Sequence, residues 1–516
     1  MSPSSHGPVT PHAPRWRPSL AHVVLLALAL PDLVAAPISP TIHRQTQTYV
    51  QIGNLAAHGF SWDAFSLGLD GAKPFRAIFE FPIYHALSAV ALRFVSHSWF
   101  WPKLLSLLAT CAAIMSLRVW ISRRWGGGVG GLATVVFAAM PIVLLMATAI
   151  QPDALALALT VGLLIAMERW RLSPLLSRWL VVLVLGLLAL LVKFTVVIPF
   201  VPVLIWLYLQ SPSGARWPRA ADIATAVLVV GLPFIWWLRV RGRHTDPAFL
   251  QLDRMLFFGG ELRRFLSPGF YVKPMFIIGA MVCAGAGLPL AVLGLRRLDP
   301  VGWALVAGIP LFFLVIPTAA DQTYYSFALA PIFAILIARG WLAVEVRFPS
   351  RVAQARAVMI LACVAGLAIA VPYTLRRDDV TWNAARALAG VSRADDFALV
   401  LNMHDRGVGI GGFNPAMLVL AERNGWNLSP ATADVSAIAA AVSHRRSEGA
   451  RWLVATWFTA ELDPWFTPLL PAAFSRQPRL QGQPVDGRAI VQALMQQFSS
   501  AAAGENYVVL RLDDRP

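Results

Sequence analysis

Charged side chains are scarce in this 516-residue chain, since Asp, Glu, Lys and Arg together make up 14% of it. Soluble globular domains carry about 25%. Hydrophobic residues reach 57%, and most of them lie in runs of roughly 18–22 residues, the length of a membrane-spanning helix. The composition therefore excludes an ordinary soluble enzyme. Only about the last 140 residues have soluble composition.

Cysteine and the familiar catalytic motifs are also lacking. Cys111, Cys283 and Cys363 all fall inside apolar runs, without the spacing of metal ligands or of a disulfide framework. We interpret them as small core residues. The chain has no P-loop, no paired CxxC, no HExxH and no nucleophile elbow. Any chemistry must therefore come from dispersed residues.

Acidic residues are outnumbered, with 27 Asp and Glu against 43 Lys and Arg, which gives a net charge of +16. In a soluble protein this excess would indicate nucleic acid. We reject that interpretation, because the arginines sit mostly between apolar runs, where the positive-inside rule places them. The 19 tryptophans are typical of interfacial belts.

The apolar runs predict eleven membrane spans, with ends defined to within about 2–4 residues. The fifth and sixth spans are nearly continuous and turn near Lys193. A signal peptide is the competing interpretation of the first run, but no clear cleavage site follows it. The spans are 20–38, 101–121, 128–148, 152–169, 178–192, 194–209, 221–240, 273–295, 301–318, 325–343 and 357–374.

The stretch 81–96 (FPIYHALSAVALRFVS) is short for a span. We predict that it lies in the membrane interface. This choice places the arginine-rich loops in the cytoplasm, as the positive-inside rule requires. The outer loop 39–100, the turn at 151–153, Lys193 and the loop 241–272 then all face outward.

The composition turns soluble from Arg376 onward. We therefore divide the chain into a cytoplasmic tail (1–19), a transmembrane domain (20–375) and a periplasmic α/β domain (376–516). In the last domain, strands are expected at 397–401, 452–456 and 507–512. Helices are expected at 414–423, opening with Asn414 as N-cap and Pro415 as first helical residue, and at 435–444.

The first outer loop is the densest group of polar residues. A helix over 43–57 would place Arg44, Gln47 and Thr48 on one face, where they could hold a phosphate or sugar hydroxyls. The alternative is a solvated interfacial helix whose arginine meets lipid headgroups. Asp63 and Asp70 in the same loop are weaker candidates for chemistry.

Three further charges stand at membrane edges. Glu80 is costly to desolvate unless it is paired or functional, although a helix-start acid before Pro82 is the simple alternative. Asp153 follows a proline at a helix start, so capping explains it equally well. Lys193 lies within a long apolar stretch, where a phosphate is a natural partner and snorkelling is the alternative.

The late outward turn carries Asp321, Tyr324 and Tyr325, of which the tyrosines are also consistent with belt residues. Asp32 is ambiguous, and His244 with Asp246 is too isolated to assign. No one of these residues is a specific motif. Arg44, Glu80, Asp153 and Lys193 are more informative together than singly.

The order of seven segments along the chain is typical of one family of membrane enzymes. The segments are RQTQTY, EFPIYHALSAVAL, QPDALALAL, LVKF, DQTYYSFALAPIFAILIARG, NPAMLVLAERNGW and GARWLVAT. In this organisation the chain resembles the GT-C membrane glycosyltransferases. More narrowly, it resembles bacterial members akin to lipid A aminoarabinose transferases and protein O-mannosyltransferases. The resemblance covers most of the chain, through short segments. It implies a helical bundle around a cavity open to the periplasm, and sugar transfer from a polyprenyl-phosphate carrier with inversion at C1.

The resemblance also implies roles for individual residues. Glu80 matches the acid before the proline of the second interfacial helix, and Asp153 matches the outward Pro-Asp acid. Lys193 matches a lysine that meets the donor phosphate, and Arg44 lies in the equivalent first-loop helix. Gln47 stands where family members usually carry an aspartate as general base. Glu80 then takes that role, or the acceptor needs no strong base, or the match is shifted by a turn.

The sequence therefore predicts an all-α polytopic bundle of about 11 transmembrane helices, with interfacial helices and a small C-terminal α/β periplasmic domain. The predicted function is that of an inner-membrane glycosyltransferase, with Glu80 and Asp153 catalytic. Donor binding is assigned to Arg44, Gln47, Lys193, Asp321, Tyr324 and Tyr325. The partners are a polyprenyl-phosphate-linked sugar and a lipid, glycan or protein acceptor, with or without a divalent metal. The alternatives are a lipid or polysaccharide transporter and a non-catalytic envelope assembly protein. The sugar, the acceptor and the oligomeric state are left open by the sequence.

Overall fold

The computed structural model describes most of the chain. The described residues are 19–37, 41–71, 73–210, 216–251, 268–285, 287–296, 298–320, 322–351, 378–402, 414–428, 435–457, 479–480, 483–484 and 487–513, with scattered positions between 353 and 368.

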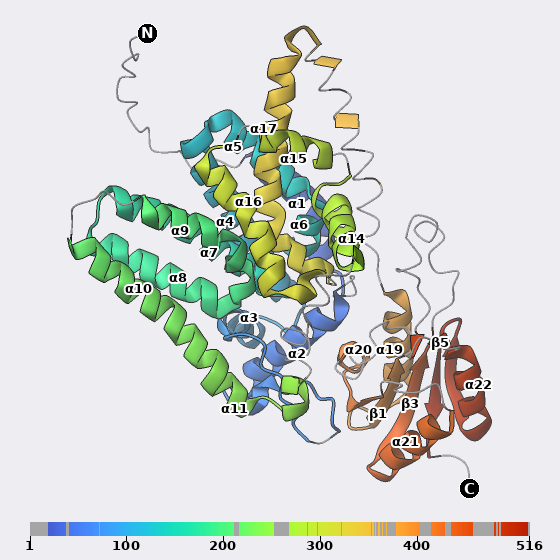
Figure 1. Ribbon diagram of the computed structural model, residues 1–516. Helices are drawn as coiled ribbons and strands as arrows, with labels where there is room; N and C mark the ends of the chain where they lie inside the picture. Colours follow the sequence, from blue (N-terminus) through green and yellow to red (C-terminus); the bar gives the residue numbers. More distant parts are fainter. Residues whose placement is uncertain are drawn as a thin grey trace, which may run out of the picture.

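Most of the described chain forms a bundle of apolar helices (Figure 1). Short 3-10 or π segments continue several of them. The helices of the bundle are α1 (Leu20–Leu33), α4 (Phe100–Trp125), α5 (Gly127–Ala139), α6 (Pro141–Ala147), α7 (Asp153–Leu172), α8 (Leu176–Val197), α9 (Val201–Leu209), α10 (Arg216–Ile235), α14 (Pro268–Ile277), α15 (Gly287–Leu295), α16 (Pro300–Val315) and α17 (Ala330–Arg347).

The bundle is that of a multi-pass membrane protein. Within the described residues, 4 helical segments are long and apolar enough to cross a membrane, or up to 6 if each of two bent pairs is one span. α1 and α16 are shorter apolar helices. The predicted total of eleven spans is thus not confirmed. The eleventh, 357–374, lies largely outside the described residues.

The predicted turn near Lys193 is confirmed. Helical geometry is interrupted at this residue, where φ is −166° and ψ is 95°. α9 then leads back beside α7, because the ring of Tyr208 near its end lies 4.9 Å from the guanidinium of Arg171 at the end of α7. Two prolines, Pro199 and Pro202, follow the break and prevent the helix from continuing undisturbed.

α2 (Ile42–His58), the 3-10 helix η1 (Trp62–Phe65) and α3 (Ile83–Phe94) form a layer below the bundle in Figure 1. The predicted first-loop helix is therefore present. α3 has 12 residues. A helix of that length spans about 18 Å, against about 30 Å for the hydrocarbon core. Such a helix is short for a crossing, as the interfacial prediction expects.

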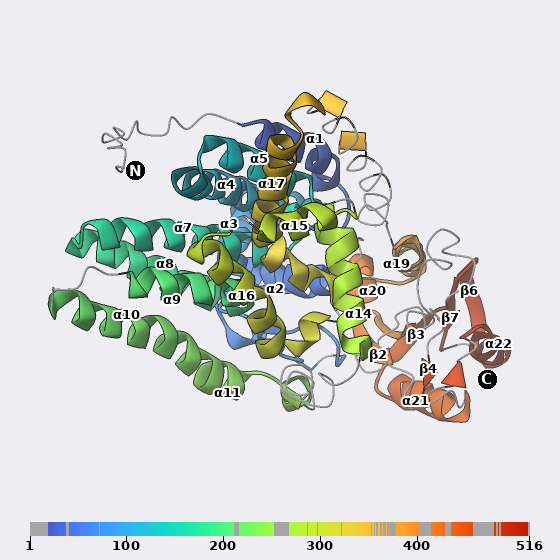
Figure 2. The same cartoon turned by 45° about the horizontal axis from the view of Figure 1, so that its top comes forward.

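The C-terminal part is a mixed five-stranded sheet in the order β2-β1-β3-β7-β6, flanked by helices (Figure 2). β1 pairs in parallel with β2 and β3, whereas β7 pairs antiparallel with β3 and β6. The elements are α19 (Asp379–Val391), β1 (Phe397–Asn402), α20 (Ala416–Ala421), β2 (Asn424–Leu428), α21 (Val435–Ser447), β3 (Ala450–Thr456), β4 (Arg479–Leu480), β5 (Gln483–Pro484), α22 (Gly487–Gln497), β6 (Ser499–Gly504) and β7 (Tyr507–Arg511).

The three predicted strands and two predicted helices are thus present. The predicted N-cap of α20 is shifted by one residue. Pro415 holds the N-cap position, and Asn414 precedes it with its side-chain oxygen accepting from the amide of Ala416 at 3.0 Å. The side chain of Asn414 therefore still satisfies one of the free amides at the start of the helix.

This soluble part is docked onto the first outer loop through backbone contacts. The amide of Gly71 donates to the carbonyl of Gly425 at 2.8 Å. The amide of Gly425 in turn donates to the carbonyl of Gly68 at 3.3 Å. Gly71 has φ +60°, and a Cβ there would stand 2.2 Å from the ring of Trp426. Only glycine fits this crossing without displacing the ring.

The hydrophobic core of the soluble part is shared with the outer loop. One buried cluster joins side chains of the loop and Phe249 to side chains of α19, β1, α20, β3 and β7. Its loop members are Ile42, Leu67, Leu69 and Ala77. The loop is therefore a structural layer between the bundle and the sheet.

Candidate functional site

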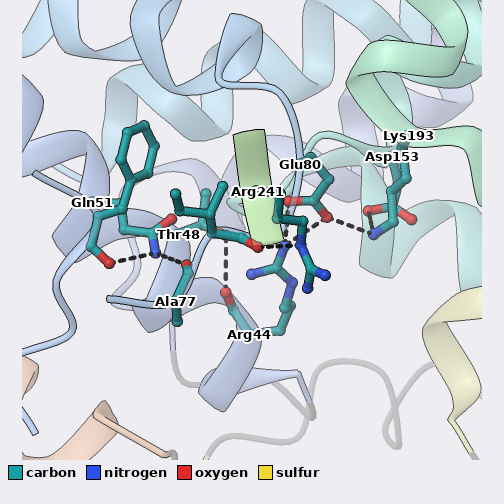
Figure 3. A network of polar contacts seen from close by, with 10 residues as sticks. Arg44, Thr48, Gln51, Ala77, Glu80, Asp153, Lys193 and Arg241 are labelled. Atoms are coloured by element: carbon teal, nitrogen blue, oxygen red, sulfur yellow. Dashed lines mark hydrogen bonds and ion pairs between the residues drawn. The ribbon is translucent and has the colours of Figure 1, made fainter. Parts of the chain in front are cut away.

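Four of the predicted site residues meet in one buried network (Figure 3). Arg44 comes from α2, Glu80 from the segment before α3, Asp153 from the first turn of α7 and Lys193 from the break between α8 and α9. All four are at most 9% exposed. Buried charges are stable only when paired, so their convergence explains why each is tolerated in an apolar chain.

The contacts of the network are short. Both carboxylate oxygens of Glu80 lie 2.6 Å from Nη2 of Arg44. Nζ of Lys193 donates to Oδ2 of Asp153 at 2.7 Å and lies 3.7 Å from Oε1 of Glu80. Lys193 therefore links the two carboxylates, and the four side chains form one continuous charged chain.

The break at Lys193 also fixes the position of Glu80. The carbonyl of Leu191, near the break, accepts a hydrogen bond from the amide of Phe81 at 3.2 Å. Phe81 directly follows Glu80 in the chain. A backbone bond thus sets the spacing between Glu80 and Lys193, independently of their side chains.

The turn that precedes α7 positions Asp153. The amide of Ile150 donates to Oε1 of Gln45 on α2 at 3.0 Å. The hydroxyl of Ser106 on α4 donates to the carbonyl of Ala149 at 2.6 Å. Two helices therefore hold the turn from which Asp153 projects. Asp153 does not cap α7, because Pro152 holds the N-cap position and the carboxylate of Asp153 binds Lys193.

Tyr324 and Tyr325 extend the site from the 3-10 helix η6 (Thr323–Leu329). Nζ of Lys193 lies 5.3 Å from the ring centre of Tyr324 and 5.7 Å from that of Tyr325. Both distances are within the range of cation–π attraction. The predicted grouping of these tyrosines with Lys193 is therefore present. Asp321 lies outside the described residues.

α2 places Arg44, Gln47 and Thr48 on one buried face, as predicted, but the hydroxyl of Thr48 is engaged within the helix. Gln47 is buried one turn after Arg44. The hydroxyl of Thr48 donates to the carbonyl of Arg44 at 3.0 Å, within its own helix. Thr48 therefore closes a local backbone contact, and Arg44 with Gln47 remain the polar side chains of interest on this turn.

Arg241 was missed by the sequence analysis. It ends the π-helix η3 (Trp236–Arg241) and is 3% exposed. Its Nε donates to the carbonyl of Ile78 at 2.5 Å, and Figure 3 shows its side chain close to those of Arg44 and Glu80. In the sequence it is one of several arginines after an apolar run, the usual pattern of a membrane edge. Only its burial distinguishes it.

Electrostatics favour an ionised Glu80. Burial opposes its charge, but the guanidinium of Arg44 and the ammonium of Lys193 outweigh this and hold the pKa of Glu80 below its usual 4.5. Burial likewise opposes the charge of Arg44, and the carboxylate of Glu80 outweighs it, so the pKa of Arg44 is raised. Arg241 adds a third cationic side chain close to these two carboxylates.

The remaining acidic candidates lie elsewhere. Asp32 accepts from Nζ of Lys103 at 2.9 Å and from the hydroxyl of Thr148 at 2.7 Å. Asp63 pairs with Arg76 in an exposed bridge of 2.7 Å. The described residues contain no group of three or more His, Cys, Asp or Glu side chains suited to hold a metal ion.

His244 and Asp246, which follow the π-helix η3, both have structural partners. The ring of His244 stacks on that of Trp62 at 3.9 Å. The carboxylate of Asp246 accepts from the amide of Ala248 at 2.9 Å. Neither residue contacts the charged network through these interactions.

Comparison with solved structures identifies the fold. The chain is similar to ArnT from Cupriavidus metallidurans bound to undecaprenyl phosphate, with TM-score 0.56 and 14% identity over 95% of this chain and 96% of that one. It is also similar to the Archaeoglobus fulgidus oligosaccharyltransferase in complex with Zn and sulfate, with TM-score 0.52 and 11% identity over 84% of this chain and 67% of that one.

Both proteins have the GT-C fold of membrane glycosyltransferases. The chain therefore has the GT-C fold, as its sequence organisation predicts. The sequence itself matches no protein-family model and no functionally characterised protein in a sequence comparison.

Proposed function

We propose that this protein is a glycosyltransferase that moves a sugar from a polyprenyl-phosphate donor to an acceptor at the outer face of the bacterial inner membrane. The acceptor belongs to the class of lipids, glycans or proteins that meet this face. The donor class is supported by the fold shared with ArnT, whose structure contains undecaprenyl phosphate.

The observation that carries the proposal is the buried network of Arg44, Glu80, Asp153 and Lys193. Nη1 of Arg44 is buried and has no hydrogen-bond partner among the described residues. A buried guanidinium nitrogen without a hydrogen-bond acceptor destabilises the folded protein, and a bound acceptor removes this cost. A phosphate oxygen is such an acceptor, and Arg44 and Lys193 are suited to bind it.

The reaction is an in-line displacement at C1 of the sugar. A lone pair of the acceptor oxygen or nitrogen forms the new bond to C1, while the bond between C1 and the phosphate oxygen breaks and its electron pair stays on the phosphate. Inversion at C1 follows from this geometry. Arg44 and Lys193 stabilise the negative charge on the departing phosphate.

The proton of the acceptor passes to a carboxylate. We assign Glu80 as this general base, because it is ionised and stands at the loop end of the network. Asp153, bound to Lys193 at 2.7 Å, orients the ammonium for the phosphate. The donor is already activated, so the protein contributes mainly positioning and electrostatics.

The experiment is sugar transfer by the purified full chain. The protein is incubated with undecaprenyl phosphate carrying different sugars, with and without divalent metal. We expect release of undecaprenyl phosphate with at least one sugar, and loss of the reaction in Lys193→Ala. Lys103→Gln removes a different buried, paired lysine and should keep transfer. Failure of every donor to bind or react would overturn the proposal.

A further inference from the structure

A second set of buried polar atoms lies beside the charged network, between α2 and α3. α2 and α3 pack against each other, and Arg44 and Gln51 lie on one face of α2, seven residues apart. Gln51 is fully buried and His85 on α3 is 1% exposed. The set therefore belongs to the interior of the loop layer and not to its surface.

Four of these atoms have no hydrogen-bond partner among the described residues. They are Nη1 of Arg44, Oε1 of Gln51, and both ring nitrogens of His85. Native proteins leave few buried polar atoms unsatisfied, and each one costs about 1–3 kcal/mol. Four in one place indicate a group that is bound there in the working protein.

The atoms lie near one another. The ring of His85 stands 6.4 Å from that of Phe65, and the carbonyl of Phe65 accepts from Nε2 of Gln51 at 3.3 Å. His85 also interacts electrostatically with both Glu80 and Arg44. His85 is therefore near Phe65, whose carbonyl binds the amide of Gln51, and within electrostatic reach of the charged network.

The chemistry of the set distinguishes among ligands. Burial lowers the pKa of His85 to about 4, so at neutral pH its ring is uncharged and offers one donor and one acceptor. Gln51 offers an acceptor, and Arg44 offers a donor. A phosphate only accepts, and an isoprenoid chain does neither. A hydroxyl both donates and accepts, which matches this mixed set.

We infer that His85 and Gln51, next to Arg44, form a binding site for the hydroxyl groups of the transferred sugar. This inference rests on the proposed function, because a sugar is bonded directly to the phosphate that Arg44 and Lys193 would bind. The sugar then lies within a few ångströms of those side chains, where His85 reaches its hydroxyls. His85 acts here as a specificity-determining residue that touches substrate.

The test compares two ligands in the full chain: undecaprenyl phosphate, and the same lipid phosphate carrying the sugar that the wild type transfers. His85→Phe keeps an aromatic ring and removes both nitrogens. We expect it to weaken binding of the sugar-bearing lipid by about tenfold or more, with binding of the bare lipid phosphate unchanged. His85→Gln, which keeps a donor and an acceptor, should recover part of the loss.

The control is His22→Phe. His22 is also a buried histidine, but its ring is satisfied by Ser19 and by the carbonyl of Cys111. We expect this variant to lower thermal stability and to leave the ratio of the two affinities unchanged. His85→Phe should leave thermal stability unchanged or raised, because it removes unsatisfied polar atoms.

Three outcomes would overturn the inference. If His85→Phe binds each ligand as tightly as the wild type does, ordered water alone occupies the site. A raised acceptor KM with an unchanged affinity ratio would assign His85 to the acceptor. An equal loss for both ligands would make its role structural, and His85→Gln decides the question if His85→Phe does not fold. Absence of any lipid-phosphate binding in the wild type would instead contradict the proposed function.

Discussion

Lys193 and Asp153 form an ion pair of 2.7 Å between the ends of two different bundle helices, 40 residues apart in the chain. The pair exists because α8 is broken at Lys193 and α7 begins at Asp153. Removing one partner strands the other charge in an apolar surrounding. Lys193→Met should therefore destabilise the protein by about 3–5 kcal/mol. The double variant Lys193→Met/Asp153→Asn should regain most of that loss in thermal unfolding in detergent.

Comparing these two variants distinguishes the contribution of Lys193 to the stability of the protein from its contribution to binding of undecaprenyl phosphate. Both lack the ammonium, so both should bind undecaprenyl phosphate more weakly than wild type. A double variant as unstable as Lys193→Met would contradict the pairing as a source of stability.

Glu80→Gln tests the general base. The variant keeps shape and hydrogen bonding but cannot accept the proton, so we expect kcat to fall by about 10²–10⁴-fold with little change in donor binding. Asp63→Asn is the matched control, because Asp63 is an exposed loop carboxylate in a bridge with Arg76. Near-normal turnover in Glu80→Gln, together with inactivity of Asp153→Asn, would transfer the role to Asp153.

The pH profile follows from the lowered pKa of Glu80. Because Arg44 and Lys193 hold this pKa below 4.5, the carboxylate stays ionised as the pH falls through that value. The acid limb of kcat/KM should therefore lie below pH 4.5. The stabilising pairing with Arg44 is likewise present above the ordinary carboxyl pKa and is lost only when the pH passes below the folded one. An acid limb near pH 6 would show that another group titrates.

Gln47→Asp can restore a carboxylate beside Arg44. Gln47 is buried one turn from Arg44, so in the Glu80→Gln background an aspartate there returns a negative charge to the network. We expect about tenfold or more of the lost turnover to return. Gln47→Asn in the same background serves as control and should return nothing. Equal activity of the two double variants would exclude position 47 as a site for the base.

Gly71→Ala tests the docking of the soluble part. Its Cβ would meet the ring of Trp426 at 2.2 Å, whereas Gly59, with φ +73°, has open space around the same position. Gly59→Ala therefore reports backbone strain alone. We expect only Gly71→Ala to increase hydrogen exchange in β2. Identical behaviour of the two variants would mean that strain, and not the clash, matters.

The membrane topology is tested by reporter fusions after Arg124, Arg297 and Arg515. The charge distribution predicts cytoplasmic signals for the first two and a periplasmic signal for the third. A periplasmic signal after Arg124 would mean that the stretch 81–96 crosses the membrane.

The elements most readily predicted from the sequence are those with strong local signals. The apolar runs, the first-loop helix and the strand β3 have clear composition or periodicity. Spans were harder to count, because α5 and α6 are bent by 69° at Met140–Pro141 and the apolar run 176–209 folds back at Lys193. Hydropathy measures composition and does not report such bends.

Only those site residues that have a local signal in the sequence could be predicted. Glu80, Asp153 and Lys193 are charges in apolar surroundings, which marks them singly. Arg241 lies among other arginines and His85 sits in an ordinary amphipathic helix, so neither has a local signal. Only the packing of α2, α3 and η3 around Glu80 brings them to the network.

The shared core between the outer loop and the sheet has a consequence for biogenesis. Leu67 and Leu69 are synthesised early, whereas their partners Ala398, Val400 and Val454 emerge near the end of translation. These contacts are among the most non-local in the chain, and non-local contacts form slowly. The apolar side chains of the loop therefore stay uncovered until the C-terminal part of the chain has been synthesised.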